Sequence, residues 1–107
     1  MRAFVNKTFV WSCPSSSDYE EMVSKVESVQ DYCEENGIEF VEHYHPYEKS
    51  LAFCVSSKSP NLAHCKIEVA RIGNMLSEEL GRDYEVTYYH YGDSVMDCFA
   101  LFNTQEN

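Results

Sequence analysis

Hydrophobic and polar positions alternate along residues 3–12. Ala3, Val5, Phe9 and Trp11 stand on odd-numbered positions and alternate with neighbours that are mostly more polar. Alternation with a period of two is typical of a β-strand that is buried on one face. The pattern therefore predicts that the chain begins with a strand, which a segment containing proline and serine then ends.

A period of three to four residues replaces the alternation from about residue 18. Ser17 and Glu20 have the spacing of a capping box, in which two side chains satisfy the free amides of a helix start. Gly37 accepts the left-handed conformation that commonly ends a helix. The sequence predicts one helix over 18–35, with an apolar stripe formed by Tyr19, Met22, Val23, Val26, Val29 and Cys33.

Two further strands are predicted over 38–44 and 51–57, joined by a loop over 45–50 whose length suits a hairpin. A second helix follows, because Ser59-Pro60 has the cap-then-proline order of a helix start. Its apolar stripe, which Gly81 ends, consists of Leu62, Cys65, Val69, Ile72, Leu76 and Leu80.

Gly73 lies inside this second helix, where glycine costs about 1 kcal/mol relative to alanine. A glycine at such a position commonly marks a place where the helix backbone passes close to another element. We therefore expect the helix to approach the sheet closely at Gly73.

The end of the chain has the pattern of a second hairpin, with strands over 84–91 and 95–102 around Gly92-Asp93. The order β-α-β-β-α-β-β predicts an α+β fold in which the split β-α-β, ferredoxin-like arrangement gains one C-terminal strand. We expect an antiparallel five-stranded sheet in the order 5-4-1-3-2, with both helices on one face. Residues 1–107 are predicted to form a single domain, with a loose tail over 103–107.

Composition places the chain among globular proteins. Of its 107 residues 44% are hydrophobic, which is enough to fold in spite of a net charge of −10. No segment has the pattern of a signal peptide or a membrane span, so we expect a cytoplasmic protein. An odd number of cysteines without a C-x-x-C pair favours reduced, buried thiols at Cys13, Cys33, Cys54, Cys65 and Cys98.

Acidic residues are concentrated in one segment. Ten of the eighteen aspartates and glutamates fall between residues 18 and 48, where Lys25 is the single basic residue. The seven on the predicted first helix span roughly 26 Å, a length over which one strand of B-DNA carries about seven or eight phosphates. We hypothesise that this face mimics a nucleic-acid backbone and docks on a basic protein surface through Asp18, Glu20, Glu21, Glu27, Asp31, Glu34, Glu35, Glu39, Glu42 and Glu48.

A simpler explanation of the same residues is that an acidic outer face keeps a small domain in solution. The basic residues are scattered, so the sequence lacks the footprint of a protein that binds nucleic acid directly, and its charge repels anionic membranes. Whether a second acidic group joins the first depends on the order of the strands. This group consists of Glu78, Glu79, Asp83, Glu85, Asp93 and Asp97.

Histidine and cysteine offer a different chemistry. His43 and His45 are predicted to face outward from one strand, whereas the phase set by Val86 places His90 on the inward face. Because they do not converge, we predict no metal site and no cofactor. Cys54 and His43 on adjacent strands have the residue types of a nucleophile and its base. A buried, inert thiol is the commoner arrangement, so no catalytic residue is predicted.

The sheet face opposite the helices is a second candidate interface. Tyrosine, which is concentrated in the two predicted hairpins, combines apolar area with a polar tip and is enriched in interfaces. An uncovered face of this kind predicts a homodimer or a bound partner, and a wet outer face is the alternative. By alternation we place on it His43, His45, Thr87, Tyr89 and Tyr91.

These patterns predict a small acidic binding protein that is not an enzyme. We expect it to inhibit a nucleic-acid-handling protein by occupying its basic surface. In composition it is similar to compact acidic inhibitors such as those that phages encode as anti-defence proteins. Two alternatives stay open: a small ligand-binding or metal/Cys-His enzyme domain with a cleft at an oligomer interface, and a structural protein that forms oligomers.

Overall fold

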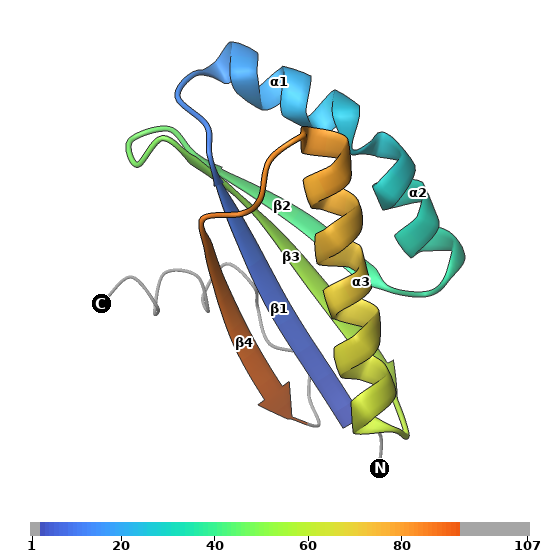
Figure 1. Cartoon of the computed structure of the whole chain (residues 1–107). Helices are drawn as coiled ribbons and strands as arrows, with labels where there is room; N and C mark the ends of the chain where they lie inside the picture. The colour runs from blue at the N-terminus through green and yellow to red at the C-terminus, as the bar shows by residue number, and fades with distance from the viewer. Residues whose placement is uncertain (1–2, 93–107) are drawn as a thin grey trace.

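Strands and helices occupy separate layers of this protein. The computed structural model describes the backbone of residues 3–92 and the side chains of residues 5–87. Within that range the chain forms a four-stranded antiparallel sheet and three helices, so the fold is α+β (Figure 1).

The sheet is built around β1 (Ala3–Ser12), which pairs with β3 (Ser50–Ser59) on one side and β4 (Val86–Gly92) on the other. β2 (Glu39–His45) pairs with the far edge of β3. The resulting order, β2-β3-β1-β4, is the one predicted for these four strands. The fifth predicted strand and the predicted tail lie outside the described residues.

The predicted single helix over 18–35 is wrong, because the chain forms α1 (Ser16–Lys25) and α2 (Glu27–Glu35) with a break at Val26. The backbone amides of Val29 and Gln30 both donate to the Val26 carbonyl, each at 3.0 Å, and so begin a new helix. The Val26 side chain is buried. The break therefore keeps an apolar side chain in the core while the helical axis changes direction (Figure 1).

α1 also begins at a different cap from the one predicted. Ser15, rather than Ser17, is the N-cap: its hydroxyl accepts a hydrogen bond from the Asp18 amide at 3.2 Å and donates one to Asp18 Oδ2 at 2.8 Å. An aspartate in the first turn is also favoured by the helix dipole. At the far end of α2, Gly37 takes the predicted left-handed conformation, with φ +70°.

α3 (Leu62–Leu80) is the longest helix, and Asn61 caps it instead of the predicted Ser59-Pro60. Asn61 Oδ1 accepts a hydrogen bond from the His64 amide, while Ser59 Oγ accepts one from the Asn61 amide. Gly81 ends the helix with φ +76°, as predicted. In the part of the chain that the structure describes, no helix combines the length and apolar character needed to cross a bilayer.

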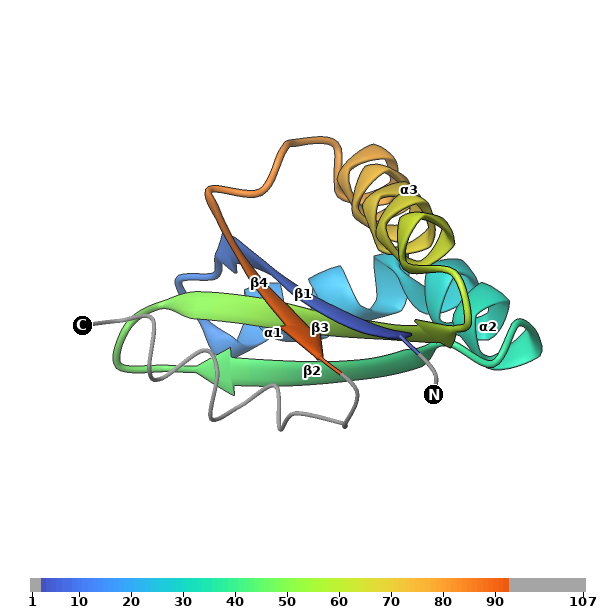
Figure 2. The same cartoon turned by 90° about the horizontal axis from the view of Figure 1, so that it is seen from below.

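All three helices pack on one face of the sheet, as Figure 2 shows for α3. On that face β1 contributes Val5, Phe9 and Trp11, which are fully buried against residues from every helix. Trp11 Nε1 donates a hydrogen bond to the Arg82 carbonyl at 2.9 Å. This bond ties the segment after α3 to the central strand.

Gly73 lies against Phe9, which confirms the predicted close approach of α3 to the sheet. A Cβ atom added at Gly73 would lie 2.3 Å from Phe9 Cε1 and 2.5 Å from Phe9 Cζ. Carbon atoms in contact are about 3.5–4.0 Å apart. A residue with a Cβ atom at this position would therefore require Phe9 or the helix to shift.

Candidate protein-binding surface

The acidic residues of α1 and α2 lie on the side of these helices that faces away from the core. Met22, Val29 and Cys33 turn inward and are buried. Of the seven acidic residues on the two helices, Asp18 is half-buried beside its cap. The exposed six are Glu20, Glu21, Glu27, Asp31, Glu34 and Glu35.

The break at Val26 changes the shape of this acidic surface. A single helix would have carried the seven carboxylates along one straight line of roughly 26 Å. The two observed helices have ten and nine residues, or about 15 and 14 Å, and they point in different directions (Figure 1). The comparison with the regular spacing of a phosphate strand therefore applies at most to each helix separately.

The three acidic residues predicted beyond the helices have different environments. Glu39 is exposed on β2, and Glu48 is exposed in the β2–β3 turn with Oε1 3.8 Å from His45 Nδ1. Glu42 is half-buried on β2, and the Tyr19 hydroxyl donates a 2.7 Å hydrogen bond to its Oε2 atom. This hydrogen bond raises the pKa of Tyr19. Glu42 therefore fastens α1 to the sheet and is less accessible to a partner than the helical acids.

The second acidic group adjoins the first through α2 and α3. Ser28 Oγ on α2 donates a hydrogen bond to Glu79 Oε1 on α3 at 3.1 Å. Glu78 and Glu79 are both exposed at the end of α3. Asp83 and Glu85 follow in the next loop and are also exposed, whereas Asp93 and Asp97 lie outside the described residues. The carboxylates of Glu78 and Glu79 thus extend the acidic surface of α2.

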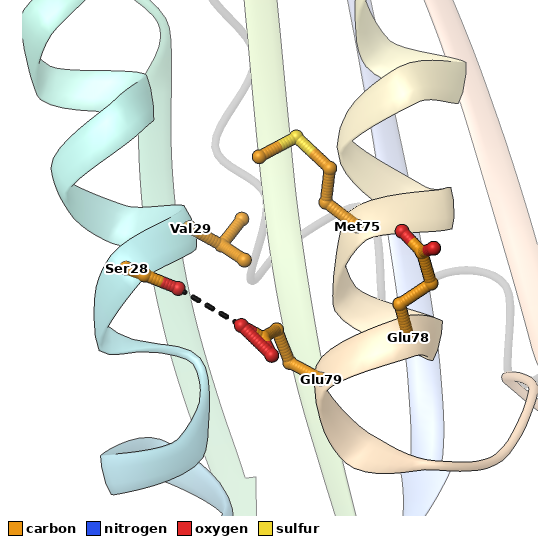
Figure 3. Close-up of a pocket in the computed structure, with 5 residues that line it drawn as sticks. All are labelled: Ser28, Val29, Met75, Glu78 and Glu79. Atoms are coloured by element: carbon orange, nitrogen blue, oxygen red, sulfur yellow. Dashed lines mark hydrogen bonds between the residues drawn. The ribbon is translucent and has the colours of Figure 1, made fainter.

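A pocket of about 290 Å³ lies at this junction, lined by Ser28, Val29, Met75, Glu78 and Glu79. Figure 3 shows that Ser28 and Val29 come from α2 and the other three from α3, with Met75 extending toward Val29. Sequence reasoning did not identify Ser28 or Met75. Neither residue lies on a predicted apolar stripe. The helical period also does not predict which sides of two helices far apart in the sequence contact each other.

The carboxylates of this surface have no lysine or arginine partner within the described residues. The ion pairs found there within 4.0 Å both involve histidine: His45 with Glu48, and His64 with Glu68. Lys25, four residues after Glu21 on α1, forms no such pair with a carboxylate of a described residue. Lysine and arginine side chains of the described residues therefore do not neutralise the negative charge of α1 and α2.

The predicted sheet-face residues divide between the two faces. His43 and His45 pair with Ala52 and Ser50 on the face away from the helices, as predicted. Thr87 differs from the expectation, because it pairs with Phe9, whose side chain lies in the helix-covered core. The same register places positions 89 and 91 of β4 opposite Lys7 and Val5.

The physical reason for this difference lies just before β4. Tyr84 packs on the core, with its ring 5.0 Å from that of Phe9, and suggests an inward phase for even-numbered positions. β4 begins at Val86, and the residue before it, Glu85, donates a backbone hydrogen bond to the Val10 carbonyl at 2.8 Å. Val86, opposite Val10, is then 42% exposed. The phase of Tyr84 therefore does not carry into the strand.

The outward sheet face is less open than expected. At its centre Thr8, Val10, Ala52 and Cys54 are all buried, whereas Val41 on β2 is 44% exposed. The register places His90 opposite Asn6, in a row that reaches β2 at Glu39, four residues from His43. Position 90 has the same phase as Val86, which pairs with Val10 on the outward face, so the backbone register contradicts the predicted inward phase of His90. The three histidines still occupy separate positions of the sheet.

The four described cysteines are buried thiols without disulfides, as predicted, and Cys98 lies outside the described residues. Burial, with a smaller contribution from Glu68, raises the pKa of Cys33 to about 11. Cys54 Sγ accepts a hydrogen bond from Thr8 Oγ1 at 3.4 Å. A protonated thiol is a poor nucleophile, so Cys33 is not suited to nucleophilic catalysis near neutral pH.

No protein-family model matches the chain, and a search of curated proteins found no match.

Proposed function

We propose that the protein acts by binding, and that the acidic surface of α1 and α2 docks on a basic surface of a nucleic-acid-handling protein and blocks it. The observation that carries the proposal is the set of six exposed carboxylates on these helices, none of which pairs with a described lysine or arginine. A dense field of one sign accelerates encounter with a partner of the opposite sign and fixes its orientation.

Mimicry of nucleic acid is the specific form of this proposal. The partner's groove would meet two short acidic segments joined at Val26, with Glu78 and Glu79 beside the second segment. The fold that we assume is the ferredoxin-like arrangement with a fifth strand, which the observed order β2-β3-β1-β4 supports. Binding would act by steric and electrostatic occlusion and needs no catalytic group.

Affinity capture from a lysate of the cells in which the protein acts tests the proposal. We expect the immobilised protein to retain a basic, nucleic-acid-handling protein at about 0.05 M salt and to release it at about 0.5 M, where the screening length falls several-fold. The double variant Asp31→Asn with Glu35→Gln should retain much less of it. Asp83→Asn with Glu85→Gln removes the same charge from exposed positions after α3 and serves as the control.

Retention that ignores salt, or that both double variants reduce equally, would overturn the proposal. Two alternative proposals are a small ligand-binding or enzyme domain and an oligomeric structural protein. His43 and His45, which are half-buried on β2, would carry the chemistry of the first or lie in the interface of the second.

A further inference from the structure

The pocket between α2 and α3 combines an apolar floor with an acidic rim. Val29 is 1% exposed and Met75 is half-buried, and together they form the floor. Ser28, Glu78 and Glu79 are exposed and form the rim. Figure 3 shows the Glu79 carboxylate reaching from α3 toward the Ser28 hydroxyl on α2, whereas the Glu78 side chain lies along α3.

The size of the pocket limits what it can hold. Sites for drug-sized molecules have volumes of about 300–1,000 Å³, and this pocket, at about 290 Å³, lies at or below the lower end of that range. It is therefore suited to one long side chain rather than to a nucleotide-sized ligand. A side chain with an apolar stem and a cationic head matches both the floor and the rim.

The rim is already arranged for such a head group. The 3.1 Å hydrogen bond from Ser28 Oγ holds Glu79 Oε1 at the mouth of the pocket and leaves Oε2 to accept from a ligand. Among the described residues, no lysine or arginine nitrogen lies within 4.0 Å of a carboxylate oxygen of Glu78 or Glu79. No lysine or arginine of the described part of the chain therefore competes with a cation that another molecule supplies.

We propose that this pocket receives an arginine side chain of the basic partner. The inference rests on the proposed function and names the contact at which the partner is anchored. Arginine fits better than lysine because its planar guanidinium presents five donors in a fixed fork and is more weakly hydrated than an ammonium group. The polarisable thioether of Met75 adapts to the shape of the stem.

Two blocked peptides of equal charge, hexa-arginine and hexa-lysine, test the proposal on the full chain. Binding is followed by amide chemical shifts in NMR spectra at low salt. We expect hexa-arginine to bind more tightly than hexa-lysine and to shift the signals of Ser28, Val29 and Met75 most strongly. Glu78→Gln with Glu79→Gln should weaken hexa-arginine binding by about tenfold and abolish the difference between the peptides.

Two variants with the same change of charge provide the controls. Glu34→Gln with Glu35→Gln alters an adjacent glutamate pair on α2, and Asp83→Asn with Glu85→Gln alters exposed residues after α3. The Asp83/Glu85 variant should weaken hexa-arginine binding by less than about threefold, as expected for loss of long-range attraction alone. The Glu34/Glu35 variant removes charge from the proposed docking surface but none from the pocket. It should weaken binding less than the Glu78/Glu79 variant and keep the difference between the two peptides.

The outcomes separate the two proposals. If the Glu34/Glu35 and Glu78/Glu79 variants weaken hexa-arginine equally while the Asp83/Glu85 control binds normally, the acidic surface binds but the arginine pocket does not exist. Equal binding of both peptides, with shifts spread over α1 and α2, also overturns the pocket and leaves the proposed function standing. If neither peptide binds at low salt, both proposals fail.

Discussion

At the scale of single residues, the contact between Gly73 and Phe9 sets how closely α3 approaches the sheet. The cost of a glycine inside a helix was enough to predict a close approach from the sequence. It could not identify Phe9 as the partner, because Phe9 and Gly73 are 64 positions apart and meet only when the helix packs on β1. The phenyl ring is itself held by Tyr84, whose ring packs edge-on at 5.0 Å.

Replacement of Gly73 by alanine tests this contact, because two effects oppose each other. Alanine should favour the helix by about 1 kcal/mol, whereas a Cβ atom 2.3 Å from Phe9 Cε1 overpacks the core, typically at a cost of about 1–3 kcal/mol or more. We expect the clash to dominate, so that Gly73→Ala lowers the free energy of unfolding. Urea denaturation monitored by the fluorescence of Trp11 measures it.

The neighbouring position supplies the control for this substitution. Asn74 is exposed on the same helix, so Asn74→Ala should keep only the helix-propensity gain, about 0.5 kcal/mol. If Gly73→Ala were as stable as the wild-type protein, the close packing of α3 on Phe9 would be contradicted.

At the scale of elements, the periodicity of residues 19–33 predicted helix over the whole segment and did not reveal the break. Val26 belongs to the same apolar stripe as Met22 and Val29, and nothing local distinguishes it. The break follows from packing, because α1 and α2 each have to reach a different part of the core. Met22 of α1 contacts Arg82 beyond α3, whereas α2 lies along β2 and α3.

Two serines at the start of α1 distinguish the observed cap from the predicted one. Ser15→Ala removes the hydroxyl that accepts from the Asp18 amide and should lower the free energy of unfolding by about 1 kcal/mol. Ser17 lies inside the helix, so Ser17→Ala should change it by less than about 0.5 kcal/mol. Urea midpoints of the two variants measure the difference. A larger loss for Ser17→Ala would restore the predicted capping box.

At the scale of the whole molecule, repulsion between carboxylates opposes folding. The net charge is −10, and the carboxylates of α1, α2 and the end of α3 form no ion pair with a lysine or arginine of the described residues. Added salt therefore screens chiefly the repulsion between these like charges. The repulsion is concentrated on α2, where Asp31 is three or four residues from Glu27, Glu34 and Glu35.

We expect added salt to stabilise the protein and Asp31 to account for much of the effect. Like-charge pairs at these spacings cost about 0.2–0.5 kcal/mol each, or roughly 1 kcal/mol for the three. Asp31→Asn should therefore be more stable than the wild type at low salt and gain less from added NaCl. Thermal denaturation at low and high salt measures both quantities.

Glu20→Gln is the matched control, because it removes the same charge from α1 without an acidic neighbour three or four residues away. It should keep most of the salt response of the wild type. If the two variants responded to salt identically, local repulsion on α2 would not be the cause.

The sequence by itself determined the type and order of the seven described elements apart from the division at Val26, the apolar stripes of the helices and the concentration of acid on their outer sides. Each of these features follows from the periodicity of residues within a single helix or strand. Only the tertiary structure decided the break at Val26, the face on which Thr87 lies, and the meeting of Ser28 and Met75 with Glu79. Each of these depends on packing or pairing between segments far apart in the chain, and no local pattern records it.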